Sequence, residues 1–106
     1  MTKITCREYR DNMVIIAEGH SGYGDRGSDI VCAGISVLVY TLVNTLLDEE
    51  ASDRIKLVRR VVRDGYVYIE IERFDFSRER IDGIIDAFNT GLYMLSETYP
   101  DYIAID

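Results

Sequence analysis

The pattern of apolar and polar residues begins with two short β-type runs, Lys3–Glu8 and Met13–Glu18. Between them, Arg10-Asp11-Asn12 contains an Asp and an Asn, which suit a tight turn, so the pattern predicts a β-hairpin. The segment that follows, Gly19–Ser28, carries four glycines in ten residues. Because glycine weakens the interior of a helix or a strand, we expect a loop here with unusual backbone angles.

A second hairpin is predicted further along the chain, over Ile55–Val62 and Tyr66–Glu72. Asp64-Gly65 supplies its turn, because this dipeptide favours the backbone angles of a two-residue hairpin loop. In its second strand, tyrosine or glutamate alternates with valine or isoleucine. This period of two indicates that one face of the hairpin is buried.

A long uncharged stretch, Ile30–Leu47, lies between the two hairpins and predicts a helix, with Ser28 or Asp29 as its N-cap. Its eighteen residues are at the lower limit of what crosses a bilayer. No lysine or arginine anchors either end, and Asp48 follows the stretch directly. We therefore expect a buried core helix and no membrane partner. Small or polar residues also interrupt the stretch, at Gly34, Ser36, Thr41, Asn44 and Thr45.

A second helix is predicted from Ser77 to Pro100, because apolar residues recur there at helical spacing. The order of elements is then ββαββα, which is typical of an α+β domain with two main helices on a small antiparallel sheet. Tyr102–Ile105 is a candidate for a short last strand. The length of 106 residues is that of a single domain, residues 1–106. The apolar positions of the second helix are Ile81, Ile84, Ile85, Phe88, Leu92 and Leu95.

Charge narrows the choice of partners. Nineteen acidic and twelve basic residues give a net charge of −7, which opposes attraction to nucleic acid or to an anionic membrane. A basic peptide or protein is the better partner. The chain has only two cysteines and does not start with a secretory-type segment, so we expect a reducing, cytoplasmic location.

Candidate chemistry lies where the glycine-rich loop meets the first helix. The only histidine, His20, is in this loop, and Cys32 follows twelve residues later, roughly one turn into the helix. A helix N-terminus favours the thiolate form of a cysteine, and its free N–H groups are suited to hold an oxyanion. If the loop folds back, His20 can take the proton of Cys32 and later return a proton to a leaving amine.

Spacing alone leaves a structural alternative open, since a cysteine in an apolar helix is usually packed and a histidine beside glycines is often a turn residue. Cys6 alternates with Ile4 in the first predicted strand and is interpreted as a small buried hydrophobe. One histidine and two cysteines are too few for a closed zinc site, and the acidic residues of the loop lack the spacing of a calcium loop. We expect no metal and no cofactor. A serine nucleophile, Ser21 or Ser28, is poorly placed beside its own base.

A competing signal is Gly22-Tyr23-Gly24-Asp25-Arg26-Gly27, which satisfies the dinucleotide-binding pattern G-x-G-x-x-G. Asp25 and Asp29 would put negative charge beside a bound pyrophosphate, and the flanking strands belong to hairpins and not to parallel βαβ units. The glycines are better explained as hinges of a mobile loop that covers a substrate.

The residues around His20 and Cys32 resemble those of a known family, the ribosomal-processing cysteine proteases. Its core pattern reads Gly-His-Ala-Gly-Tyr followed by Asp-Ile-Val-Cys-Ala-Ala-Val-Ser. This chain has Gly19-His20-Ser21-Gly22-Tyr23 and then Asp29-Ile30-Val31-Cys32-Ala33-Gly34-Ile35-Ser36. The likeness extends through Leu42-Val43-Asn44 and is faint at Gly91-Leu92 and Tyr99-Pro100.

The resemblance implies a dimeric cytosolic enzyme that removes a short N-terminal extension from a large-subunit ribosomal protein. By the same likeness Cys32 matches the nucleophile and His20 the base, while Asp29 and Ser36 match positions that accompany them. Asp29 has three candidate roles, which are to cap the helix, to orient His20 or to hold the substrate backbone. Ser36 lies one turn below Cys32 on the same helix face. Gly19 and Gly22 complete the expected supporting or substrate-binding set.

Two departures from the family pattern stand beside the reactive groups. Ser21 replaces alanine and adds a hydroxyl next to the expected base, and Gly34 replaces alanine inside the helix at a cost of about 0.5–1 kcal/mol. They leave open a protease of the same type that acts on another protein, such as a phage protein. The competing class is a non-catalytic dimer that binds a peptide. Fast labelling of Cys32 that slows in His20→Ala would favour the enzyme.

Overall fold

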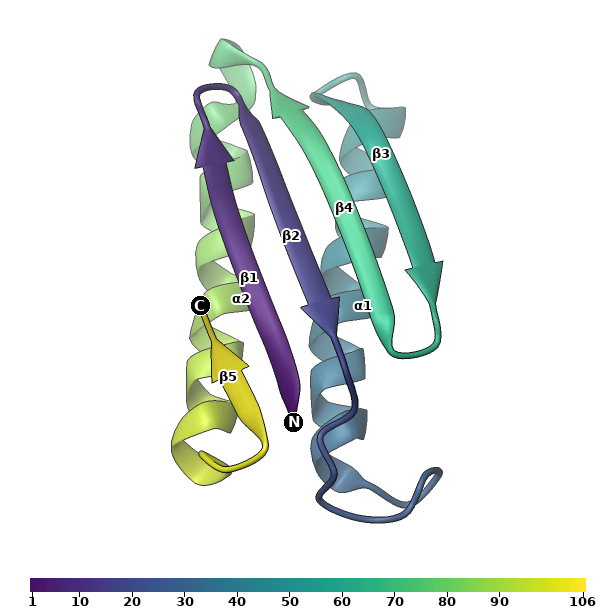
Figure 1. Cartoon of the computed structure of the whole chain (residues 1–106). Helices are drawn as coiled ribbons and strands as arrows, with labels where there is room; N and C mark the ends of the chain where they lie inside the picture. The colour runs from purple at the N-terminus through teal and green to yellow at the C-terminus, as the bar shows by residue number, and fades with distance from the viewer.

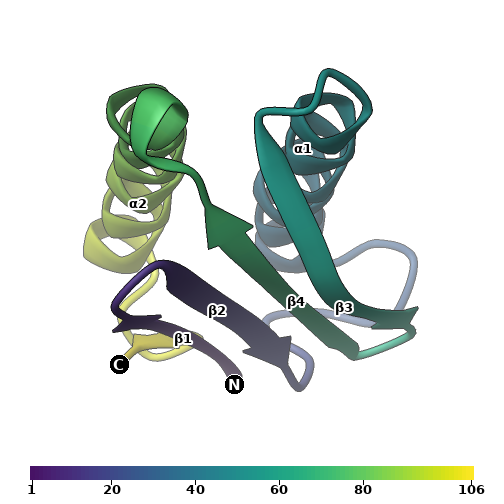
Figure 2. The same ribbon diagram turned by 90° about the horizontal axis from the view of Figure 1, so that it is seen from above.

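The computed structural model describes all residues, 1–106, and consists of one five-stranded sheet with two helices on one of its faces (Figures 1 and 2). The element order is ββαββα followed by a short last strand, as predicted. The elements are β1 (Thr2–Tyr9), β2 (Asn12–Glu18), α1 (Ile30–Ala51), β3 (Ile55–Arg63), β4 (Tyr66–Arg73), the single 3₁₀ turn η1 (Asp75–Ser77), α2 (Arg78–Thr98) and β5 (Ile103–Ile105).

The strand order in the sheet is β3-β4-β2-β1-β5. The pairs β1/β2, β2/β4 and β3/β4 are antiparallel, but β5 pairs with β1 in parallel, so the sheet is mixed and not purely antiparallel as predicted. The reason lies in the connection. β4 runs parallel to β1, and α2 carries the chain back along the sheet, so β5 starts in the same direction as β4 (Figure 1).

The core lies between the inner face of the sheet and the two helices. Alternate strand residues face the helices, which follows from the period of two in a strand. One side of α1 is buried in this core, as expected, whereas its opposite side is exposed from Ile30 to Asn44. The most buried apolar side chains are Ile4, Met13, Ile15, Ile69 and Ile71 from the sheet and Val31, Leu46, Ile81 and Leu92 from the helices.

α1 is long and apolar enough to cross a membrane by length and composition. This is weak evidence, because core helices of soluble proteins pass the same test. In this fold, 33% of its most apolar window is buried, and the buried residues pack on the sheet and on α2.

Glycines allow α1 and α2 to approach closely. A Cβ atom at Gly34 would lie 3.2 Å from Leu95 Cδ2, and one at Gly91 would lie 2.7 Å from Leu38 Cδ2. The glycine at position 34, where the family pattern has alanine, therefore has a packing reason in this chain. The crossing of the two helices fixes the N-terminal half of α1, which carries the candidate site.

Candidate active site

Asp29 joins the glycine-rich loop to the start of α1. It is the N-cap, and its Oδ1 accepts a hydrogen bond of 2.9 Å from the backbone N–H of Cys32. Its Oδ2 accepts bonds from the Ser21 hydroxyl at 2.5 Å and from the N–H groups of Tyr23 and Gly24, both at 3.1 Å. A single buried carboxylate thus organises the loop around the first turn of the helix.

Burial alone would raise the pKa of Asp29, but the hydrogen bonds from Ser21, Cys32 and Gly24 outweigh it and hold the pKa well below its usual range. The carboxylate is therefore ionised at neutral pH. It accepts hydrogen bonds from two N–H groups of the G-x-G-x-x-G segment, those of Tyr23 and Gly24, which a bound pyrophosphate would otherwise use.

The same contacts alter the expected oxyanion site. Besides the N–H of Cys32, the N–H of Ala33 is bonded to the backbone carbonyl of Asp29 at 3.0 Å. Two of the first-turn N–H groups that the sequence offered as oxyanion donors are therefore occupied by Asp29.

Cys32 is half-buried in the first turn of α1, and its sulfur contacts Ser21 twice. The Ser21 N–H donates to Sγ at 3.3 Å, and the Ser21 hydroxyl oxygen also lies 3.3 Å from Sγ. His20 is exposed and makes no hydrogen bond to Cys32 or Asp29. Instead its ring lies beside Gly65, where a Cβ atom would come within 2.9 Å of Nε2.

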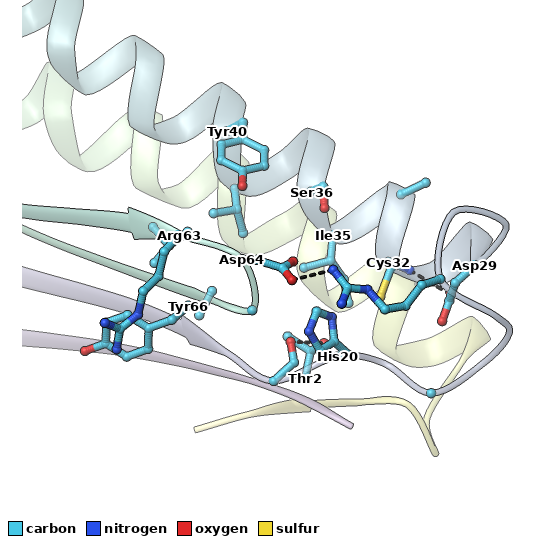
Figure 3. A pocket seen from close by; sticks show the side chains of 18 of the residues that line it. Thr2, His20, Asp29, Cys32, Ile35, Ser36, Tyr40, Arg63, Asp64 and Tyr66 are labelled. Carbon is cyan, nitrogen blue, oxygen red and sulfur yellow. Dashed lines mark hydrogen bonds and ion pairs between the residues drawn. The ribbon is translucent and has the colours of Figure 1, made fainter.

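The turn between β3 and β4 contacts the loop on both sides of His20. Gly65 accepts a hydrogen bond of 2.8 Å from the N–H of Gly19, and Asp64 forms an exposed ion pair with Arg26. Figure 3 shows Asp64 above His20, with Cys32 to one side. The sequence predicted the Asp64-Gly65 turn but gave no sign that it meets the loop, because no local pattern reports a contact between distant segments.

These groups surround one cleft of about 550 Å³ between α1, the loop and the β3–β4 hairpin. All six predicted site residues line it, namely His20, Cys32, Asp29, Ser36, Gly19 and Gly22. Ser36 and Tyr40 project from α1 toward the hairpin (Figure 3). The apolar part of the lining comes from Ala17, Ile35, Val39 and Val67.

The comparisons with known proteins decide the family. The model of the family described as cysteine protease Prp matches residues 1–104. The chain belongs to the Prp family of cysteine proteases.

Similar proteins agree with this membership. The ribosomal processing cysteine protease Prp of Bacillus subtilis (strain 168) is 25% identical over 109 residues, covering 99% of this chain and 96% of that protein. The structure of SMU.848 from Streptococcus mutans is 30% identical, with a TM-score of 0.69, and covers 100% of this chain and 92% of that one.

An essential ribosomal processing protease Prp from S. aureus, in complex with a covalently linked product peptide, has the same fold. Its TM-score is 0.80 at 22% identity, covering 100% of this chain and 98% of that one. As a member of the Prp family, this chain is a cysteine peptidase. It has two thiols, Cys6 and Cys32, and either could in principle be the nucleophile.

Cys6 differs from Cys32 in its surroundings. It is half-buried on β1 against the core, and burial raises the pKa of its thiol. No group of three or more His, Cys, Asp or Glu side chains is placed to hold a metal ion. Of the two thiols of this Prp-family chain, Cys32 alone lines the cleft with the histidine.

Tyr23 is a loop residue of this Prp-family chain whose role the sequence analysis missed. Its ring packs edge to face against Tyr99, with centroids 5.4 Å apart, and against Tyr102, at 5.2 Å. These contacts attach the loop to the segment that links α2 and β5. An aromatic residue between glycines was the one available signal, and it did not reveal its partners.

Proposed function

We propose that this protein is an endopeptidase that removes a short N-terminal extension from a large-subunit ribosomal protein, with Cys32 as nucleophile and His20 as general base. The observation that carries the proposal is that Cys32, in the first turn of α1, and the only histidine, on a glycine-hinged loop, line the same cleft. The names of the Bacillus subtilis and S. aureus relatives support a ribosomal substrate.

The chemistry follows from these two groups. Cys32 Sγ attacks the scissile carbonyl carbon while its proton passes to the imidazole of His20. The tetrahedral intermediate collapses to a thioester as the amine leaves with the proton that His20 held. Water then attacks the thioester, giving one proton to His20, and this proton returns to Sγ when the acid product is released.

His20 has to move for this reaction, because its ring now lies beside Gly65 and not on the sulfur. Catalytic hydrogen bonds commonly tighten only when substrate is bound. Gly19 and Gly22 flank the histidine closely and have φ angles of 90° and 75°. Backbone freedom at these hinges would let the ring swing toward Cys32 as the loop closes on a peptide.

The cleft also fits the substrate class. Ala17, Ile35, Val39 and Val67 offer an apolar surface for a hydrophobic or aromatic residue before the cut, as the family resemblance implies. The hydroxyl of Ser36 supplies a polar contact for the peptide backbone. The net charge of −7 favours a basic ribosomal protein as partner.

We also propose that the enzyme acts as a cytoplasmic homodimer, joined through the exposed side of α1. This side carries no charge from Ile30 to Leu47, and Ile30 and Val37 are 57% and 67% exposed. Uncharged apolar surface of this kind is typical of interfaces. A second copy that presents the same side would cover it symmetrically.

The direct test is mass spectrometry of a peptide that carries the N-terminal extension of a ribosomal protein, after incubation with wild type, Cys32→Ala, His20→Ala and Cys6→Ala. We expect cleavage at one bond by wild type and by Cys6→Ala, and loss of at least about a thousandfold in the other two. Cleavage that survives Cys32→Ala would contradict the assignment of the nucleophile. Failure of wild type to cut would contradict the proposed substrate.

A further inference from the structure

Ser21 is built into the site through both its backbone and its side chain. It is buried, with 2% exposure, although its neighbours His20 and Gly22 are exposed. Its hydroxyl oxygen lies 2.5 Å from Asp29 Oδ2 and 3.3 Å from Cys32 Sγ, and its N–H reaches the same sulfur. The mechanism described above gives this hydroxyl no role.

The direction of each hydrogen bond follows from the donors available. An ionised carboxylate only accepts, so the Ser21 hydroxyl donates its single proton to Asp29. Its oxygen can then only accept from Cys32, and the contact with Sγ is therefore S–H···O. The result is a series of two hydrogen bonds, in which the Cys32 thiol donates to the Ser21 oxygen and the Ser21 hydroxyl donates to Asp29.

This series of hydrogen bonds favours the neutral form of the Cys32 thiol. If Cys32 lost its proton where it stands, the Ser21 oxygen would present a lone pair to the sulfur anion. Turning the hydroxyl toward the anion would break its bond to Asp29, which is charge-assisted and among the stronger hydrogen bonds of the site. The Ser21 N–H and the start of α1 favour the thiolate, as do the positive charges of Arg26 and Arg63 in the cleft.

We propose that Ser21 is a positioning residue that keeps Cys32 protonated while the cleft is empty, so that the thiol ionises only when His20 reaches it. This inference rests on the proposed role of Cys32 as nucleophile. It adds a safeguard to that role, because a protonated resting thiol reacts slowly with electrophiles and oxidants. Slow labelling of the empty enzyme is then compatible with catalysis, and the fast labelling expected from the sequence no longer separates an enzyme from a peptide-binding module. Closure of the loop then activates the thiol and positions the peptide in one step.

Other charged or titratable groups line the cleft, and a Ser21→Ala variant replaces none of them. They belong to the loop, to α1 and to the β3–β4 hairpin, so a Ser21→Ala variant isolates the hydroxyl. These groups are His20, Arg26 and Asp29, Tyr40, and Arg63, Asp64 and Tyr66.

The test is the pH dependence of alkylation by iodoacetamide, in a Cys6→Ala background where Cys32 is the only thiol. Ser21→Ala is compared with Ser28→Ala, which removes an exposed hydroxyl of the same loop that bonds only to the Asp25 carbonyl. We expect the labelling midpoint of Ser21→Ala to move to lower pH and its rate at pH 7 to rise about fivefold, as for the loss of one hydrogen bond. Ser28→Ala should match the background.

An unchanged midpoint in Ser21→Ala, or one at higher pH, would overturn the proposal, because the hydroxyl would then be neutral or would donate to the thiolate. If Ser21→Ala does not fold, the infrared S–H band of the Cys6→Ala protein decides. A band at neutral pH below the frequency of a free thiol supports the proposal, whereas a missing or unshifted band refutes it.

The outcome is separable from that of the proposed function. Peptide cleavage by wild type with an unchanged labelling midpoint in Ser21→Ala would reject the role of Ser21 alone. A shifted midpoint without any cleavage would reject the proposed substrate and leave the protonated thiol established.

Discussion

At the scale of single residues, Gly65 combines two requirements. Its φ angle of 71° lies in the left-handed region that favours glycine, and its missing side chain leaves room for the ring of His20. A Cβ atom at this position would meet Nε2 at 2.9 Å, so the exposed ring of His20 would have to turn away from the hairpin. The β3–β4 turn therefore helps to set where the histidine rests.

We expect Gly65→Ala to lower kcat/KM for peptide cleavage by about tenfold or more, because the ring of His20 would lose the resting position in the cleft from which we propose that it swings toward Cys32. Gly27→Ala is the matched control, since Gly27 has a φ angle of 89° but nothing within 4 Å of an added Cβ atom. Both variants carry the same backbone strain, so equal activities in a steady-state assay would show that the contact with His20 is irrelevant.

The sequence predicts His20 and Cys32 as candidate reactive residues, but it does not give their arrangement. His20 and Cys32 were found from residue type and family pattern, and both line one cleft. The bonds that Ser21 makes, and the space that Gly65 leaves, depend on contacts between segments distant in the chain. No local pattern contains that information.

At the scale of elements, Glu49 joins the end of α1 to β3 and α2. It is buried, with 2% exposure, and forms ion pairs with Arg54, just before β3, and Arg80 in α2. Burial alone would raise the pKa of Glu49, but the hydrogen bonds from Arg80 and Arg54 lower it below its ordinary value. These ion pairs stabilise the side of the fold opposite the glycine-rich loop.

Glu49→Gln should lower the free energy of unfolding by about 1–2 kcal/mol at pH 7. This loss is small for a buried ion pair, because Arg80 is largely exposed to solvent, which weakens its interaction with Glu49. A carboxyl whose pKa is lowered by folding stabilises the protein fully at pH values above its pKa in the unfolded state, about 4.3. This stabilisation disappears as the pH falls through its pKa in the folded state. The difference from wild type should therefore shrink in acid. Urea titrations at several pH values measure it.

Asp48→Asn is the control, because it removes an exposed carboxylate from the same turn, where a negative charge is unfavourable to the helix. A loss of stability in Asp48→Asn equal to that in Glu49→Gln would show that the ion pairs with the arginines do not matter.

The elements themselves were largely predictable, because the second hairpin and the second helix have clear periodic patterns and the first helix is a long uncharged stretch. The missed feature is the parallel pairing of β5 with β1. Three residues are too few to carry a pattern of their own, and the strand's direction depends on the path of α2 across the sheet.

At the scale of the whole molecule, the exposed side of α1 leads to a prediction about assembly. If this side joins two copies, Val37→Glu places an unpaired charge in the interface and should convert the dimer to a monomer. Phe76→Glu is the control, because Phe76 is 76% exposed on η1, at the end of the sheet away from the loop. Light scattering after size-exclusion chromatography gives the mass of each. A monomeric wild type would reject the interface.

The packing of Tyr23 between Tyr99 and Tyr102 has a practical consequence for following the loop in time. The chain contains no tryptophan, so Tyr23→Trp would introduce a single indole into the molecule. Its fluorescence would be blue-shifted while the ring is packed against the two tyrosines and red-shifted once the ring reaches water. A stopped-flow mixing experiment with peptide would then time the movement of the loop separately from the cleavage that follows.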